Sequence, residues 1–282
     1  MLLLIAPAAI LMTLFQVVPI VIGANASFRD WALNNPKKTW VGLSHYVEVL
    51  TDPAFLQVVL PNTFLFMIVS VGGALTAGLG LALLLDRGFR GQKIVQTILL
   101  LPVMVAPVIA AIMLRWMFND QFGIVNVMLE ALGIDGQPWI AQRWSAFAVI
   151  LLTDIWLWTP WFMLLLLAGL RSLPKEPFEA AAIDGTTSWR VFRHLTLPML
   201  RPVIVVCVVI RSIDAFRTFD IVWTLTGGGP ARSTELVSLY AYLHAFLNLD
   251  FGKGSAAALI GGAIILVIGL VLYRFLDRVM RA

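Results

Sequence analysis

Six stretches of the chain are continuously apolar over a length that can cross a membrane. Four of them contain no charged residue: 1–28, 53–85, 94–114 and 254–273. The other two, 144–170 and 202–225, contain ionisable residues. A hydrocarbon core about 30 Å thick requires about 20 helical residues, and backbone groups in lipid must be satisfied within a helix or a closed barrel. Because the apolar positions do not alternate with polar ones, the pattern predicts an all-α membrane protein with six transmembrane helices.

We expect these helices to form a single transmembrane domain over 1–282. Their expected positions are about 2–24, 62–85, 94–117, 145–170, 200–224 and 254–276. The first apolar run is too long for a secretory signal peptide and no basic residue precedes it, so we expect a retained span. Pro102 and Pro107 fall within the third helix and are expected to kink or interrupt it. Residues 233–252 are expected to form an amphipathic helix or a re-entrant connection.

The composition agrees with a membrane protein and excludes several kinds of site. Apolar residues make up 60% of the chain and charged residues 13%, against roughly 25% charged residues in soluble proteins. Cys207 is the only cysteine, so no disulfide or cysteine-based metal site can form within the chain. The sequence contains no Walker motif, and Gly227–Pro230 lacks the Lys-Ser/Thr of a phosphate-binding loop. We therefore predict no catalytic residue, no metal site and no nucleic-acid partner.

The distribution of basic residues predicts the orientation of the chain in the membrane. If both termini are cytoplasmic, eleven basic residues lie inside: Arg87, Arg90, Lys93, Arg171, Lys175, Arg190, Arg193, Arg201, Arg274, Arg278 and Arg281. Six then lie outside: Arg29, Lys37, Lys38, Arg143, Arg232 and Lys253. Cytoplasmic loops carry an excess of Lys and Arg. The pattern therefore predicts cytoplasmic termini, with the polar segment 174–198 on the same side.

This polar segment, which contains EAAAIDGTTSWRVFRHLTLP over Glu179–Pro198, is expected to form two short helices. Prolines are tolerated in a first helical turn, and the alanines that follow favour a helix. Gly185 is expected to end that helix as a C-terminal cap. Thr187 or Ser188 can cap a second helix over Trp189–Leu195, which is expected to end before Pro198.

One face of the first short helix is lined by small residues. Phe178, Ala181, Ala182 and Gly185 follow the i, i+3, i+4, i+7 spacing of a single stripe. A helix that lies on a bilayer would present bulky apolar residues opposite lysines, whereas alanine and glycine supply little affinity for lipid. The stripe, flanked by Glu179 and other charged residues, therefore favours docking into a groove of another protein.

The same segment resembles a known family. Glu179-Ala180-Ala181, then Gly185, then Leu195-Thr196-Leu197-Pro198 is similar to the EAA loop of binding-protein-dependent ABC importers. Further segments resemble the carbohydrate branch, of the maltose and glycerol-3-phosphate permease type: Val41–Phe55, Asn62–Phe66, Asp154–Pro174 and Phe216–Pro230. The resemblance covers essentially the whole chain, with Thr186 in place of the alanine usual in the family.

The resemblance implies a type I ABC importer permease fold with a cytoplasmic coupling helix, in a bacterial or archaeal inner membrane. It implies as partners a second permease, two cytoplasmic ATPases and a periplasmic or lipid-anchored solute-binding protein. ATP and Mg would bind the ATPases, and this chain would hold no cofactor. The residues that would contact an ATPase are Phe178, Glu179, Ala180, Ala181, Ala182, Asp184 and Gly185.

Ionisable residues within the predicted spans are candidates for a solute path. Arg211, Asp214, Arg217 and Asp220 recur at steps of three on the predicted fifth helix. They could form a structural ladder of ion pairs or a polar wall. The resemblance places Arg211, Asp214, Ala215 and Thr218 in a sugar-contacting stretch. On the fourth helix it adds Trp158 and Trp161, whose rings could stack on a sugar, while Trp156 could anchor the helix at the interface. Asp154, on the same helix, could line the same cavity.

Two other functions remain open at the level of sequence. An ion-coupled carrier could use Asp154 or Asp214 as a proton site, although such carriers tend to show inverted repeats, which we do not find. An importer of glycerol phosphate or another anionic sugar derivative would give Arg211 an anion to bind. A membrane enzyme is disfavoured because no catalytic constellation is present.

Overall fold

The computed structural model describes residues 7, 8, 10–33 and 37–281, with side chains as far as Arg274. The described chain is mostly helical and divides into two compact units. The first unit comprises Met1–Thr63 and Glu235–Leu266, and the second comprises Phe64–Thr234 and Val267–Ala282. Helices α4 (Leu60–Asp86) and α14 (Phe251–Arg281) contribute residues to both units.

The first unit combines short helices with a small hairpin. Its elements are a π-helical turn Thr13–Val17, α2 (Val18–Ser27), β1 (Arg29–Asp30), β2 (Thr39–Trp40), α3 (Ser44–Thr51), a π-helical turn Phe55–Val59, α13 (Val237–Tyr242) and a π-helical turn Leu243–Leu247. The strands are antiparallel, with Arg29 opposite Trp40. Tyr240 joins distant parts of the chain, because its hydroxyl donates to Asp52 Oδ2 (2.7 Å) and its ring packs 5.1 Å from that of Phe55.

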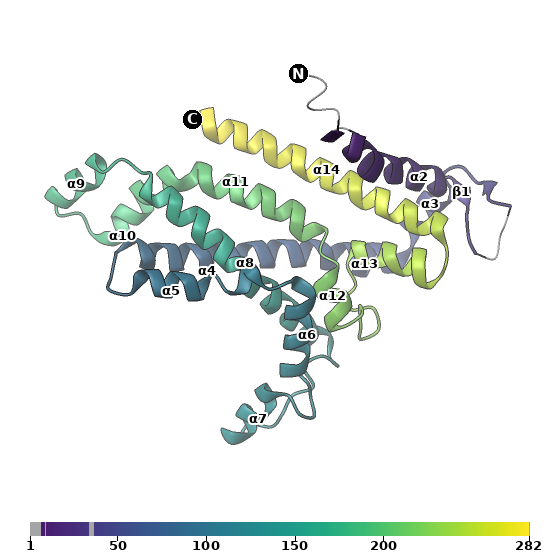
Figure 1. Ribbon diagram of the computed structural model, residues 1–282, viewed down its shortest axis with the longest axis horizontal. Helices are drawn as coiled ribbons and strands as arrows, with labels where there is room; N and C mark the ends of the chain where they lie inside the picture. Colours follow the sequence, from purple (N-terminus) through teal and green to yellow (C-terminus); the bar gives the residue numbers. More distant parts are fainter. Residues whose placement is uncertain (1–6, 9, 34–36, 282) are drawn as a thin grey trace. The chain divides into compact units, whose positions relative to one another are not determined.

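The second unit holds the residues predicted to be functional. Its elements are α5 (Gln92–Leu99), a 3₁₀ turn Pro102–Met104, α6 (Pro107–Met117), α7 (Ile124–Ala131), α8 (Arg143–Arg171), α9 (Glu176–Ile183), α10 (Ser188–Val191), a π-helical turn Phe192–Thr196, α11 (Leu197–Phe216) and α12 (Asp220–Leu225). Helices α8 and α11 pack together, as do α6 and α12. Helices α9 and α10 lie beyond the ends of α8 and α11, which they connect (Figure 1).

Five helices within the described residues are long and apolar enough to cross a membrane. They are Ile10–Ser27, Phe55–Asp86, Arg143–Arg171, Ser188–Phe216 and Phe251–Arg274. The segment expected as a third span, 94–117, is instead divided. Helix α5 ends at Leu99, and α6 begins at Pro107 after a 3₁₀ turn. Proline lacks the N–H that would continue a helical ladder and disfavours a helical conformation in the residue before it, which accounts for the division.

The expected fifth helix, 200–224, differs from the structure at both ends. The helix begins earlier, since α10 continues through a π-helical turn into α11 and does not end before Pro198. A π-helical turn accommodates a proline without ending the helix. At the other end α11 stops at Phe216, and α12 begins only at Asp220. Residues 217–219 therefore form a link between two helices.

Helix α4 approaches α8 closely at Gly78. A Cβ atom at this position would lie 2.6 Å from Cβ of Phe162 and 2.9 Å from the backbone nitrogen of Met163, both on α8. Small residues allow helices in membranes to pack backbone against backbone. Gly80, on the same helix, has nothing within 4 Å of the corresponding point.

We expect Gly78→Ala to lower the thermal unfolding midpoint of the purified protein, because overpacking costs about 1–3 kcal/mol. Gly80→Ala is the matched control and is expected to leave the midpoint unchanged or raise it, since alanine favours a helix more than glycine does. Cys207, only 1% exposed and the sole cysteine, allows unfolding to be followed with a thiol-reactive dye. Equal midpoints for the two variants would contradict the close packing.

Candidate functional site

A buried ion pair joins α8 to α11. Arg211 is only 1% exposed, and its Nη2 donates to both carboxylate oxygens of Asp154, at 2.7 and 2.5 Å. Its Nη1 donates to Oδ2 of Asp214 at 2.8 Å. The guanidinium carbon also lies 4.4 Å from the ring centre of Trp158, within the range of a cation–π interaction. One arginine thus contacts two carboxylates and an indole.

The helical spacing explains why these side chains meet. Asp154 and Trp158 are four residues apart on α8, and Arg211 and Asp214 are three apart on α11, so each pair shares one face of its helix. Ser70 adds a third helix, α4, because its hydroxyl donates to Asp154 Oδ2. A buried charge is stable only when it is paired and hydrogen-bonded. The cluster therefore binds three helices together, and loss of one partner leaves a charge uncompensated.

Of the two alternatives for the charges of the expected fifth helix, the structure has only the first step of the ladder. Arg211 and Asp214 do form an i, i+3 pair, but α11 ends at Phe216, before the ladder can continue to Arg217 and Asp220. The shorter contacts of Arg211 go to Asp154 on another helix. The pairing is therefore between helices as well as along one.

A cavity of ≈ 190 Å³ lies beside this cluster. It is formed by α8, the end of α11, the link 217–219, the start of α12 and the first residue of α6, and its lining is Pro107, Asp154, Trp158, Asp214, Arg217, Thr218, Phe219, Asp220 and Ile221. The wall thus combines carboxylates, a guanidinium, a hydroxyl and aromatic rings. Such a mixture suits a polar solute that carries both hydroxyl groups and apolar C–H faces.

The structure gathers four of the seven predicted path residues on the cavity: Asp154, Trp158, Asp214 and Thr218. Arg211 lies buried behind it, in contact with its carboxylates. Ala215 is fully buried, and Trp161 packs against Trp158 and Phe162 rather than lining the cavity. Sequence reasoning did not select Phe219 or Ile221. Their position depends on the helix break at 217–219, which no proline or glycine indicates.

The polar segment has the predicted glycine-capped end. Gly185 has φ +65°, a conformation that favours glycine. Its N–H donates to the carbonyl of Ala182 at 3.2 Å, and the N–H of Thr186 donates to the carbonyl of Ala181 at 3.0 Å. These two bonds form a Schellman motif. The motif ends α9 and turns the chain toward α10.

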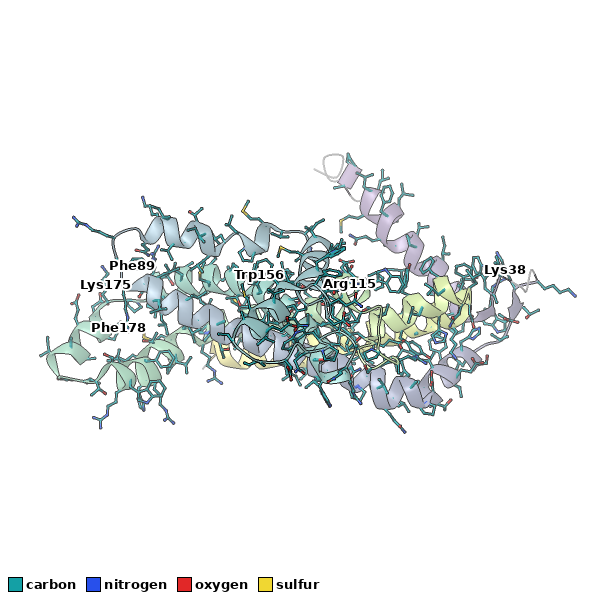
Figure 2. All side chains as sticks on the ribbon, turned by 90° about the horizontal axis from the view of Figure 1, so that it is seen from below. Lys38, Phe89, Arg115, Trp156, Lys175 and Phe178 are labelled. Carbon is teal, nitrogen blue, oxygen red and sulfur yellow. The ribbon has the colours of Figure 1, made fainter. Side chains whose placement is uncertain are left out.

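The predicted stripe of small residues does not lie on one accessible face. Ala181 is buried and Phe178 half-buried, whereas Ala182 and Gly185 are exposed. Phe178 and Ala182 line a hollow of ≈ 750 Å³ beneath α9, together with the ends of α4 and α8. Figure 2 shows Phe178 and Lys175 at the same end of this unit as Phe89. Part of the stripe therefore packs against other residues of this chain and is not available to a partner.

The outward side of α9 presents other residues. Ala180 and Asp184 are exposed, and Ile183 is 87% exposed at the last turn of the helix. Glu179 is exposed too, although it also lines the hollow. Because this segment is the one that the resemblance assigns to an ATPase contact, its exposed apolar side chain is a candidate for that contact. Sequence reasoning missed Ile183, although it lies one turn after Glu179 within the segment singled out.

The family model for the inner membrane component of binding-protein-dependent transport systems matches residues 74–282. The chain belongs to this family. The match includes α8 to α12, and so both the cavity and the polar segment. As a member, this permease is a multi-pass membrane protein and a transport subunit of an ABC importer, in which ATP hydrolysis resides in partner subunits.

Several known proteins are similar to this permease over most of its length. It is 38% identical to the sulfoquinovosyl glycerol transport system permease protein SmoG of Agrobacterium fabrum, over 97% of this chain and 89% of that one. It is 38% identical to the trehalose/maltose transport system permease protein MalF of Thermococcus litoralis, over 82% of this chain and 78% of that one. A crystal structure of a bacterial ABC transporter involved in the import of the acidic polysaccharide alginate matches with a TM-score of 0.85 at 25% identity, covering 96% of this chain and 93% of that one. The type I permease fold follows.

Proposed function

We propose that the chain forms half of the translocation path of an ATP-driven importer for a sugar, a polyol or a sugar derivative. The observation that carries this proposal is the cavity beside α8 and α11, where the carboxylates of Asp154 and Asp214, the hydroxyl of Thr218 and the ring of Trp158 come together. Carboxylates and hydroxyls bond to sugar hydroxyls, and aromatic faces stack on sugar C–H groups. The relative named above for trehalose and maltose supports a sugar as the solute. The relative named for sulfoquinovosyl glycerol, a sulfonated compound, supports a sugar derivative.

The importer would contain a second homologous permease, two cytoplasmic ATPases and an external solute-binding protein. The binding protein is implied by the family description. Both termini and the connection 174–198 would face the cytoplasm, in line with the excess of basic residues on that side. The coupling residues would be Phe178, Glu179, Ala180, Ala181, Ala182, Asp184 and Gly185, to which the exposure of Ile183 adds one more.

ATP-driven closure of the ATPases would push on α9, and the helices would then rock between inward- and outward-facing states. Such a change requires that the ATPases contact α9 differently in the two states, since only a difference in affinity can shift a conformational equilibrium. The Ser70–Asp154–Arg211 cluster would let α4, α8 and α11 move as one body during this step.

Transport by reconstituted vesicles tests the proposal. The complete transporter, purified with its ATPases and supplied with its binding protein, is expected to take up labelled trehalose or maltose only when ATP is present on the ATPase side. An uncoupler is expected to leave uptake unchanged. Uptake that persists without ATP and collapses with the uncoupler would instead support an ion-coupled carrier that uses Asp154 or Asp214.

A further inference from the structure

Arg211 is not available to a solute. Both of its Nη groups donate to carboxylates, of Asp154 and Asp214. Its side chain is 1% exposed, and it does not belong to the cavity lining. Its Nε has no hydrogen-bond partner among the described residues but is buried as well, so an anionic group would have to enter the packed interior to reach this guanidinium. Arg211 therefore neutralises the buried carboxylate of Asp154 and the half-exposed carboxylate of Asp214 rather than marking an anion site.

The groups that face the cavity carry a negative excess. The carboxylates come from three elements: Asp154 on α8, Asp214 on α11 and Asp220 on α12. Against them stand Arg217, in the link, and Arg211 behind the wall. Three carboxylates against two guanidinium groups leave one formal negative charge. Asp154 is buried and paired with Arg211, whereas the side chain of Asp214 is 48% exposed and Asp220 is exposed as well. Asp214 and Asp220 are therefore the carboxylates placed to meet a solute.

We propose that this cavity selects uncharged, hydroxyl-bearing solutes against anionic ones, and that Asp214 sets the selection together with Asp220. The inference rests on the proposed function, because it names the solute class of the same path. A carboxylate accepts hydrogen bonds from hydroxyl groups without needing a proton of its own. The same charge repels a carboxylate, sulfonate or phosphate, and the repulsion is stronger beside a low-dielectric wall than in bulk water.

Only a few side chains of this cavity would contact the solute. Thr218 and Phe219 follow Asp214 in the chain and line the same cavity. Trp158 supplies an aromatic ring from the facing helix. A neutral sugar would find acceptor oxygens, a hydroxyl and an apolar ring within one small space. An anionic sugar would find one guanidinium on the cavity wall, that of Arg217, against the carboxylates of Asp214 and Asp220.

The electrostatic potential of the cavity can be measured without knowing the solute. In the complete transporter, Thr218→Cys would be labelled with a cationic (trimethylammonioethyl) or an anionic (sulfonatoethyl) methanethiosulfonate. The cation-to-anion rate ratio, divided by that of free cysteine, is expected to be at least about tenfold. Adding Asp214→Asn is expected to lower this ratio several-fold, and adding Arg217→Gln to raise it. The unsubstituted chain is the background control, since its Cys207 is buried.

A ratio of one or less, or a ratio that Asp214→Asn does not change, would overturn the proposal. Phe219→Cys provides a second reporter on the same wall, should Thr218→Cys fail to assemble. Failure of the proposed function looks different: a fully assembled transporter that imports no sugar contradicts the sugar path whatever the labelling ratio. A sugar-importing transporter with an anion-favouring ratio contradicts the selection alone.

Discussion

Asp154→Leu is expected to lower the free energy of unfolding by about 3 kcal/mol, near the lower end of the about 3–5 kcal/mol that removal of one partner from a buried ion pair costs. The substitution leaves Arg211 buried with only Asp214 to pair with, and it also removes the acceptor of Ser70. Thermal unfolding of the purified protein, followed by dye labelling of Cys207, measures the loss.

Two variants separate the ion pair from a general packing effect. Asp214→Asn keeps the shape of a carboxylate that is about half exposed and is expected to cost no more than about 1 kcal/mol, because exposed pairs contribute little. The double variant Asp154→Leu with Arg211→Met removes both charges and is expected to recover at least half of the loss, since an apolar pair of similar volume can replace a buried ion pair. A double variant no more stable than Asp154→Leu would show that the charges are not the cause.

Ile183→Asp is expected to reduce ATP-driven uptake at least tenfold without changing the unfolding midpoint. The side chain is 87% exposed, so its replacement removes no contact within this chain. At a docking surface, however, a desolvated apolar anchor is typically worth about 2 kcal/mol or more, which corresponds to a factor of about thirty. The amount of ATPase that co-purifies with the permease is measured as well, and a lower amount shows that uptake falls because the ATPases bind less well.

The matched variant Ile183→Val retains an apolar side chain and is expected to transport nearly as the original does. Glu179→Lys, on the same exposed side of α9, is expected to weaken ATPase binding in the same assay. Normal uptake and normal co-purification by Ile183→Asp would remove the last turn of α9 from the proposed contact with the ATPases.

The spans and the polar segment could be predicted from sequence because their signals are local. Uncharged runs of spanning length and the glycine that ends α9 need no knowledge of distant contacts. Pro102 and Pro107 predicted that the helix expected over 94–117 is either kinked or interrupted. The structure shows that it is interrupted.

The candidate site was predictable only in part, because its geometry depends on contacts between helices. Sequence offered Arg211 a partner only along its own helix or a place on a polar wall, whereas its shortest contact is with Asp154, 57 positions earlier. No proline or glycine in the sequence predicts the helix break after Phe216. This break brings Phe219 and Ile221 to the cavity. The resemblance placed Ala215 on the path, but it is fully buried. Successive residues of a helix point in different directions, so Ala215 does not share the cavity face of Asp214.

The link at 217–219 separates the residues that form the cavity wall from the residues that hold the helices together. The charges that hold α4, α8 and α11 together are buried within helices, whereas Arg217, Thr218 and Phe219 border the cavity from a short segment between helices. Substitutions in that segment alter the cavity wall without touching the Asp154–Arg211 pair. Importers of different solutes can therefore share the same packing of α4, α8 and α11 and differ mainly at residues 217–219 and their neighbours.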